Sequence, residues 1–518
     1  MKLFIKTIIF FTFLSYYLSF SQQGTSSTPL ELPNFIIEGK EQLNVRAGMK
    51  QLPDKPISLT KEELDSINSL EKKPSFLLPL KTIPNKIFEK TFYSGFLKGE
   101  IGRYFTPLLE AGYEFKVNNY KLFVNANFEA SNGHIENSDY NKFNAQISSQ
   151  YIAPKKYFIF GGSKTVTSFN IQNDNLKLYA INNPTDRNAL ALDFDINSTG
   201  EFEGFSFETG ANLKLFSLKD INKQNETLID AFLLITKDID DFTVGANIEF
   251  EIDNITTFNN TFTQLNGYLS YINDFLTITA KAGIQNKSDY LSNDVRIYLD
   301  GILNININKY FTLRNNLTSK YLNLSFADFY NTNPYITDTS KIGIPDVIQL
   351  KSSLLFHPSD KYSVAISANI SSSEHHPYFL YDSTGSFNLN FDKAKNWGVS
   401  CDADISFTQN DLVNLNITYQ RKELKSTGKY IPFVPSYQIA ANYRRNWSDK
   451  FGTQFGIIGY SERYTDLLNE RKLSSFFNIN AYADYKLSNN FVIYAKINNI
   501  LNSNVFIWEN YKERDLFL

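Results

Sequence analysis

The sequence predicts an all-β fold, a single large antiparallel transmembrane β-barrel that follows a short, mostly irregular N-terminal segment. Apolar and polar residues alternate through most of the chain, and this period of two places them on opposite faces of extended strands. Phe and Tyr are abundant (45 and 31 residues), yet the mean hydropathy is negative. Both properties are typical of a barrel wall, in which apolar and polar residues cancel in any averaging window.

The N-terminus has the pattern of an export signal. Lys2 and Lys6 precede an apolar stretch from Thr7 to Phe20, and small residues stand at Ser19 and Ser21. This order predicts a signal peptide over residues 1–21, with cleavage after Ser21. The apolar stretch is too short to span a membrane well. We therefore expect export toward the outer membrane of a Gram-negative envelope.

Residues 22–91 are expected to form a periplasmic N-terminal segment. Thr60 and Glu63 have capping-box spacing and predict a short helix near residues 61–72. About seventy mature residues are too few for a sizeable core, so this segment should hang in the periplasm or enter the lumen. It also holds a short apolar motif that could contact a partner. The motif consists of Leu32, Pro33, Phe35, Ile36, Ile37 and Gly39.

Residues 92–518 are predicted to form the barrel. Alternating runs such as Val295–Ile307, Val413–Tyr419 and Phe477–Tyr485 imply strands of roughly 10–14 residues, whereas strands in soluble proteins usually have about five or six. Such strands can cross ~25 Å of hydrocarbon at a tilt. The runs suggest about 22 strands, within a range of roughly 18–24. A soluble β-sandwich or solenoid is the alternative, and the strand lengths disfavour it.

Short and long connections alternate along the chain, as the periplasmic turns and extracellular loops of outer-membrane barrels do. The predicted short turns are 118–119, 154–156, 238–241, 358–361 and 488–490. The predicted long polar segments are Ser131–Tyr140, Ser217–Glu226, Tyr330–Pro345 and Ser371–Thr384.

The C-terminal sequence resembles that of TonB-dependent receptors. In that family the penultimate strand ends in an Asn-Leu-Phe-Asn type of turn, and a Gly-Arg-aromatic step opens the last strand. The residues that carry the resemblance here are Asn498, Asn499, Leu501, Asn502, Trp508, Tyr511 and Arg514. The stretch from Leu32 to Gly39 likewise looks like the family's TonB box.

The resemblance implies a receptor barrel, a periplasmic energy-coupling partner, and uptake of siderophores, cobalamin or glycans. The family's globular plug has more than a hundred residues, and residues 35–90 are too few for one. The chain therefore looks like a plugless relative, in which residues 22–90 could gate or partly fill the lumen.

The sequence offers little support for an enzyme. It has only four histidines, at positions 134, 357, 375 and 376. Ser371 to Ser373 lie beside Glu374 and His375, but neighbours in sequence rarely adopt the geometry of a catalytic triad. Loop polarity is the preferred interpretation of these residues, so we predict no catalytic residues and no cofactor.

Other chemical sites are also not predicted. Glu374, His375 and His376 could bind a metal, but no second cluster stands at ligand spacing. Asp402 and Asp404 are expected to tune the polarity of the lumen. Cys401, the only cysteine, belongs to an alternating run and is expected to be a wall residue. Lys and Arg are scattered, so the sequence does not indicate nucleic-acid binding.

The leading functional hypothesis is an outer-membrane barrel that passes or binds a solute through a polar lumen. Its predicted partners are outer-membrane lipid and a periplasmic energy-coupling or envelope-assembly protein. The alternative is a non-transporting scaffold subunit of an outer-membrane assembly or secretion complex, and a barrel enzyme is a third hypothesis. The solute is not predicted.

Overall fold

The computed structural model describes residues 95–514, except residues 182, 360 and 383. The chain divides into two units, Met1–Pro33 and Asn34–Leu518, and every described residue belongs to the second. The predicted signal peptide, the segment 22–91, the helix near 61–72 and the apolar motif 32–39 lie outside the described residues. They therefore stay predictions.

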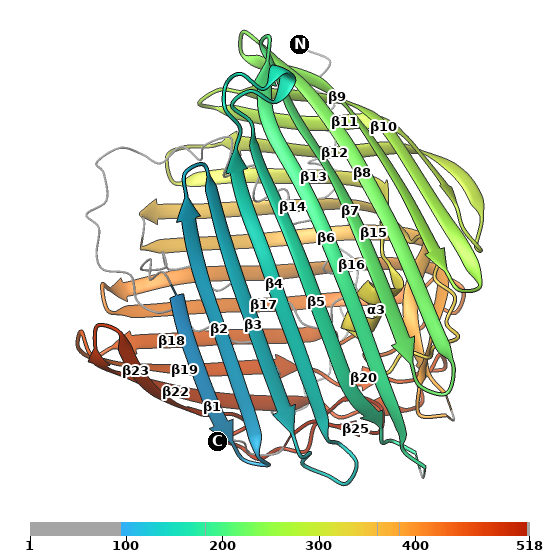
Figure 1. Cartoon of the computed structure of the whole chain (residues 1–518). Coiled ribbons are helices and arrows are strands. Elements are labelled where there is room, and N and C mark those ends of the chain that lie inside the picture. The colour runs from blue at the N-terminus through green and yellow to red at the C-terminus, as the bar shows by residue number, and fades with distance from the viewer. Residues whose placement is uncertain (1–94, 182, 360, 383, 515–518) are drawn as a thin grey trace, which may run out of the picture. The chain divides into compact units, whose positions relative to one another are not determined.

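The described residues form a 21-stranded antiparallel sheet, two small two-stranded sheets, a 3-10 helix and one short α-helix (Figure 1). The strands of the large sheet are β1 Gly95–Gly102, β2 Thr106–Val117, β3 Tyr120–Ser131, β4 Tyr140–Ile152, β5 Lys164–Leu178, β6 Thr185–Phe202, β7 Phe205–Lys219, β8 Lys223–Ile239, β9 Phe242–Ile255, β10 Phe258–Ile272, β11 Leu276–Ser288, β12 Asn293–Asn306, β13 Phe311–Tyr321, β14 Asp346–Ser359, β15 Tyr362–Tyr381, β16 Phe387–Thr408, β17 Asp411–Leu424, β18 Tyr437–Asn446, β19 Phe451–Tyr460, β22 Phe476–Ser488 and β23 Phe491–Ile497. The other elements are η1 Phe158–Phe160, α3 Phe326–Thr332, β20 Arg463–Tyr464, β21 Lys472–Leu473, β24 Phe506–Trp508 and β25 Tyr511–Lys512.

Each strand of the large sheet pairs with the next along the chain, and β22 follows β19. Because the number of strands is odd, β1 and β23 run in the same direction. The described residues show no backbone pairing between them, but their side chains meet. The hydroxyl of Tyr494 on β23 donates to Glu100 Oε1 on β1 over 2.8 Å, and Lys98 Nζ lies 5.9 Å from the Tyr494 ring centre.

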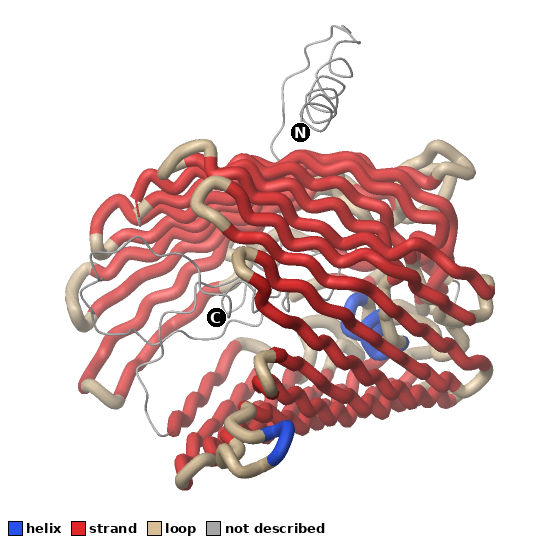
Figure 2. The backbone as a smooth tube through the Cα atoms, turned by 90° about the horizontal axis from the view of Figure 1, so that it is seen from above, coloured by secondary structure: helices blue, strands red, loops and turns tan. Residues whose placement is uncertain are grey.

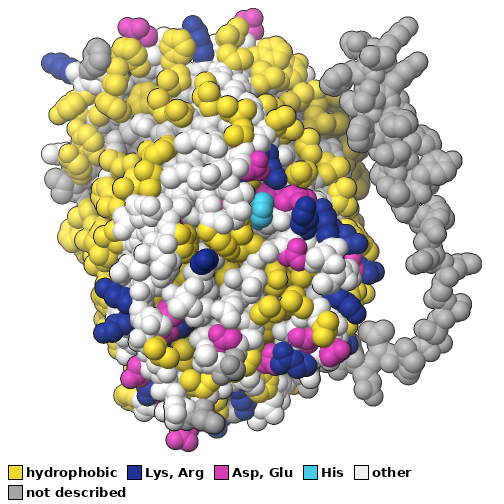
Figure 3. Space-filling model, turned by 90° about the vertical axis from the view of Figure 1, so that its right-hand side faces the viewer, with side chains coloured by type: hydrophobic (Ala, Val, Ile, Leu, Met, Phe, Trp, Pro, Cys, Tyr) yellow, Lys and Arg dark blue, Asp and Glu magenta, His cyan; other side chains and the backbone are white. Residues whose placement is uncertain are grey.

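The two faces of the sheet differ as the alternation predicts. On β12, Val295 and Ile297 are 65% and 68% exposed, whereas the intervening side chains face inward and Tyr298 is buried. Figure 3 shows hydrophobic side chains covering the flanks of the molecule, with charged side chains gathered on part of the face in view. Among the described residues, no helix is long and apolar enough to cross a membrane. The predicted all-β class is confirmed, and 21 strands lie within the predicted range.

The connections differ at the two ends of the sheet. At the end where β1 starts, here called the turn end, most connections are short, for example 118–119, 240–241 and 489–490. The opposite end, here called the loop end, carries the long connections 322–345, 425–436 and 461–475, and β23 also ends there. The predicted separation of short and long ends is therefore present.

Two predicted long segments were wrong. Residues 217–226 form the ends of β7 and β8 with a turn of three residues between them, and most of 371–384 belongs to β15, which reaches Tyr381. His375 and His376 therefore lie on β15, and His357 lies on β14, which extends to Ser359. These strand ends were predicted to be loops because their residues are polar. In the structure such residues form hydrogen bonds and ion pairs within the sheet, as Glu374 does with Lys393.

The described residues near the C-terminus form a small sheet of their own. Residues 498–514, here called the C-terminal segment, lie outside the large sheet, and β24 pairs only with β25. Trp508 and Tyr511 are instead buried in a hydrophobic core, where they pack against other aromatic rings. This part of the chain is therefore held by the burial of these rings and not by strand pairing with the wall.

The largest hydrophobic core lies on the concave side of the sheet. It is formed mainly by residues 322–345, here called the cap, together with the C-terminal segment and inward side chains of the strands. Figure 2 shows α3, which belongs to the cap, inside the ring of strands. The loop end of the lumen is therefore packed with protein.

Candidate functional site

The cap crosses the lumen and is attached to strands far apart in the sheet. Ile336 O accepts from Arg187 on β6 over 2.7 Å, and Ile342 O accepts from Asn260 Nδ2 on β10 over 3.1 Å. Phe387 N on β16 donates to Tyr335 O over 2.9 Å. Bonds to three separate parts of the wall fix the cap across the interior.

The helix of the cap begins with a capping box. The Ser325 hydroxyl accepts from Asp328 N, and the Asp328 carboxylate accepts from Ser325 N, so two free N–H groups are satisfied. Glu226 on β8 accepts hydrogen bonds from Phe326 N and, over 3.1 Å, from Ala327 N. A carboxylate at this position is stabilised by the N–H groups at the start of the helix, so the wall holds α3 through charge as well as packing.

The C-terminal segment packs on the cap through stacked aromatic rings. The Tyr335 and Tyr511 ring centres are 3.5 Å apart, and Trp508 lies 5.1 Å from Phe387. The Tyr511 hydroxyl donates to Gly385 O over 2.6 Å. The two segments therefore close the loop end together.

The residues that resemble the TonB-dependent receptor motif are only partly brought together. Asn499 is 1% exposed, and its Nδ2 donates to Ser503 O and Arg514 O, which fixes the turn after β23. Arg514 contacts Glu129 on β3 over 3.2 Å. Leu501, by contrast, is 47% exposed. These residues organise the C-terminal segment, and no chemistry at this position is evident.

A buried ion pair anchors the cap at its other edge. The Arg187 guanidinium is buried, contacts Asp220 through Nε and Nη2, and donates to Pro334 O and Ile336 O over 2.8 and 2.7 Å. Asp338 in the cap accepts from Asn222 N over 2.9 Å and shares a hydrogen bond with Asp220. We call Arg187, Asp220 and Asp338 the latch.

The two carboxyl groups of the latch have opposite pKa shifts. Burial and the neighbouring Asp220 together raise the pKa of Asp338 to about 6, because a second negative charge at this place is unfavourable. Burial also opposes ionisation of Asp220, but the hydrogen bond with Asp338 and the Arg187 guanidinium outweigh it, and the pKa of Asp220 is lowered. When the pair holds one proton, that proton therefore resides on Asp338.

Beneath the cap, the inner wall carries an acidic patch. It consists of Glu226, Asp230, Glu249, Glu251, Asp253 and, from α3, Asp328. Asp230 and Glu251 are directly opposite each other on β8 and β9, an arrangement of like charges that is unfavourable unless something compensates it. Lys214 lies close by, 3.7 Å from Asp328 and 3.3 Å from Ser325 Oγ. The patch therefore holds more carboxyl groups than the one lysine beside it can pair with.

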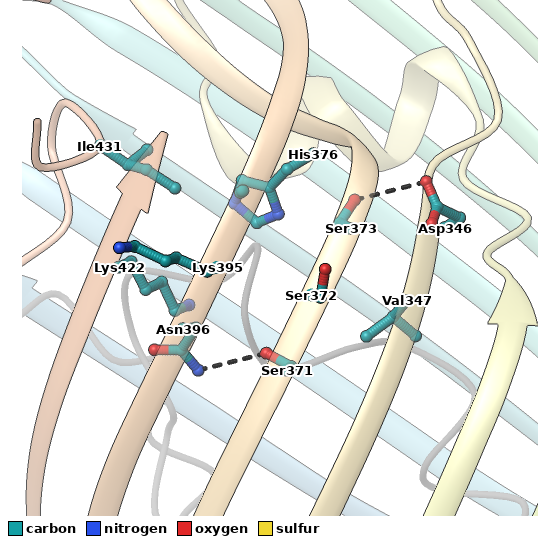
Figure 4. Close-up of a pocket in the computed structure, with 11 residues that line it drawn as sticks. Asp346, Val347, Ser371, Ser372, Ser373, His376, Lys395, Asn396, Lys422 and Ile431 are labelled. Atoms are coloured by element: carbon teal, nitrogen blue, oxygen red, sulfur yellow. Dashed lines mark hydrogen bonds between the residues drawn. The ribbon is translucent and has the colours of Figure 1, made fainter. Parts of the chain in front are cut away.

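A second polar group joins β12, β14 and β15. Asp346, 1% exposed, accepts from Arg296 Nη1 over 2.6 Å and from the backbone N–H groups of Glu374 and His375 at a β-bulge. Next to it lies a small pocket, of about 20 Å³, lined among others by Ser371, His376, Asn396 and Lys422 (Figure 4). The space is enough for about one water molecule, so it is a wall cavity rather than a solute site.

The remaining sequence candidates are dispersed along the wall. Asp402 and Asp404 each accept a hydrogen bond from an Asn on β17, Asn416 and Asn414 respectively. Within the described residues, no three or more His, Cys, Asp or Glu side chains are arranged to hold a metal ion. Cys401 is a free cysteine on β16.

The sequence interpretation missed the cap as a packed element, the latch and the acidic patch. Ser325 and Asp328 have capping-box spacing, which could have revealed α3. The partners of Arg187 lie 33, 147 and 149 positions along the chain, and no local pattern connects them. The acidic patch depends on strand register, which sequence alone does not fix.

Comparison with known proteins agrees with the fold. A family model described as "TonB dependent receptor-like, beta-barrel" matches residues 360–500. No curated protein matches the chain. The matched family is one of receptors.

Solved structures of similar fold cover most of the chain. The FrpB iron transporter from Neisseria meningitidis (F3-3 variant) has a TM-score of 0.65 at 8% identity, over 84% of this chain and 82% of that one. The siderophore receptor PirA from Acinetobacter baumannii has a TM-score of 0.61 at 10% identity, over 82% and 78%. The copper transporter OprC has a TM-score of 0.58 at 10% identity, also over 82% and 78%. The fold is that of a TonB-dependent receptor-like outer-membrane barrel.

Proposed function

We propose that this chain is an outer-membrane barrel that takes up a polar solute, with the cap and the C-terminal segment as its closed gate at the extracellular end. The observation that carries the proposal is the packing of both segments inside the lumen at the loop end. Long connections mark the extracellular end of outer-membrane barrels, whereas short turns mark the periplasmic end. The family match and the receptor and transporter folds support uptake as the class of function.

The proposed route runs along the polar inner wall. A solute arriving at the loop end would displace the cap, and the acidic patch beneath it would favour solutes that carry positive charge. A periplasmic energy-coupling protein would engage the predicted contact segment 32–39. The gate role predicted for residues 22–90 remains a separate hypothesis, and unchanged conductance after deletion of residues 31–90 would count against it.

Conductance in planar bilayers tests the gate. Replacing residues 326–342 with a short Gly-Ser linker removes most of the cap, so we expect the closed parent protein to become a stable open channel. Replacing Asn308 and Lys309 at the turn end by Gly-Ser is the matched control, because both are exposed and distant from the cap, and it should leave conductance unchanged. A cap-deleted protein that folds and still does not conduct would refute the gate.

The same packing favours a second candidate, a non-transporting scaffold of an envelope assembly. A lumen filled by apolar packing suits a rigid docking body as well as a closed gate. Stable stoichiometric partners on purification, combined with no solute flux in liposomes after removal of the cap, would favour the scaffold. Flux that appears after removal of the cap would favour uptake.

A further inference from the structure

Three buried, oxygen-bearing side chains meet beneath the cap. Asp253 on β9 and Asn260 on β10 are directly opposite each other, and each is 2% exposed. Glu226 on β8, also 2% exposed, shares a hydrogen-bond contact with Asp253. All three are on the inner face, and Glu226 is the diagonal neighbour of Asp253 across β8 and β9, so the three side chains are adjacent.

The contact between Glu226 and Asp253 requires something positive between the two groups. Glu226 accepts backbone N–H bonds from Phe326 and Ala327, and such donors favour the ionised carboxylate. A second buried carboxylate touching it would repel it strongly unless a proton or a cation lies between them. Lys214, the nearby ammonium group, is directed toward Asp328 and Ser325.

Two oxygens at this place have no hydrogen-bond donor. Asp253 Oδ1 and Asn260 Oδ1 are both buried and accept no hydrogen bond from the described residues. The Asn260 amide nitrogen donates to Ile342 O over 3.1 Å, which orients the amide and leaves its oxygen for another partner. A buried acceptor without a partner is costly, so two adjacent ones indicate a place for a hydrogen-bond donor or a cation.

We propose that Asp253, Asn260 and Glu226 form a calcium site beneath the cap. The ligand set is entirely oxygen, which is what Ca²⁺ prefers, and water molecules would complete its coordination. Since only two carboxylates contribute, the affinity should be weak, on the order of 10⁻⁴–10⁻³ M, as in extracellular calcium modules. Glu226 holds α3 and Asn260 holds Ile342, so the ion would join the wall to both ends of the cap.

Calorimetric titration of the full chain, purified in detergent and freed of metal with a chelator, tests the site with CaCl₂ as the probe. We expect one saturable site, and an affinity at least about tenfold lower in Asp253→Asn. Asp402→Asn is the matched control, because it makes the same change on the inner face of β16, where Asn416 already satisfies the carboxylate. Its affinity should equal that of the parent.

A second variant distinguishes the loss of a calcium ligand from misfolding. Asn260→Asp supplies a third carboxylate at the same place, so it should bind Ca²⁺ more tightly than the parent, by about tenfold or more. Absence of any saturable Ca²⁺ binding would mean that a proton or a water molecule occupies the site, which overturns the proposal. Equal Ca²⁺ affinity in the parent, Asp253→Asn and Asn260→Asp would also overturn it, because the ion would then bind elsewhere.

Discussion

Removing Arg187 should release the cap from the wall. Arg187 is 1% exposed, and its guanidinium compensates the charge of Asp220 and donates to two carbonyl oxygens of the cap, those of Pro334 and Ile336. In Arg187→Leu the buried Asp220 carboxylate would lose its counter-ion while it still lies next to Asp338. Breaking a buried pair from one side costs about 3–5 kcal/mol. The equilibrium constant for cap opening should therefore rise roughly a thousandfold.

Thiol labelling measures that equilibrium directly. Ser340 in the cap is 5% exposed, and its hydroxyl accepts a bond from Leu389 N over 3.3 Å, so Ser340→Cys introduces a thiol that is protected while the cap is docked. The substitution is made in a Cys401→Ala background, which removes the only native thiol. When the cap opens and closes faster than the reagent reacts, the labelling rate is proportional to the open population.

Two further variants isolate the latch. Arg444→Leu breaks the Arg444–Asp484 pair on the wall, whose side chains are 20% and 19% exposed, and should change labelling by less than about tenfold. Arg187→Lys keeps the charge but loses the fork geometry, so it should be intermediate. A labelling rate in Arg187→Leu within threefold of the parent would refute the claim that the latch holds the cap.

Three further predictions concern pH, the helix and the wall. The pKa of Asp338 in the docked cap is about 6, above its ordinary value of about 3.9, so the contribution of Asp338 to docking is complete below pH 4 and is lost as pH rises through 6. Between pH 5 and pH 8, labelling of the thiol at position 340, corrected for thiol ionisation, should therefore increase about tenfold or more, and Asp338→Asn should abolish the change. Glu226→Gln keeps only one acceptor oxygen for the two backbone N–H groups of α3, so it should lower the free energy of unfolding of α3 by about 1–3 kcal/mol and speed amide exchange there. Unchanged amide exchange in α3 would contradict the capping role of Glu226. Ile366 lies on the outer face of β15 and is 58% exposed, so Ile366→Lys near the bilayer centre should destabilise the inserted protein by about 2–4 kcal/mol. Asn369→Lys on the inner face of the same strand should be tolerated. Equal effects of the two variants on folding into lipid vesicles would show that the faces are wrongly assigned.

The sequence predicts the wall well because its determinant is local. The alternation along Val295–Ile307 specifies both the strand and which face meets lipid, and β12 covers most of this stretch. The predicted strand boundaries near the loop end were wrong, as at β15, because polar residues there still belong to the sheet. The latch depends on residues more than a hundred positions apart, so periodicity contains no information about it.

The inward folding of the cap follows from its composition. Residues 330–345 were predicted to be a long polar loop, yet this stretch and its immediate surroundings include several large apolar residues. They are Phe326, Phe329, Tyr330, Ile336, Ile342 and Ile344, and all of them are at most 2% exposed. A loop extended into water would have presented them as one large apolar patch, which folded proteins rarely tolerate. The concave face of the barrel is the nearest surface that can bury them, so the composition of a long connection should indicate whether it extends outward or folds into the lumen.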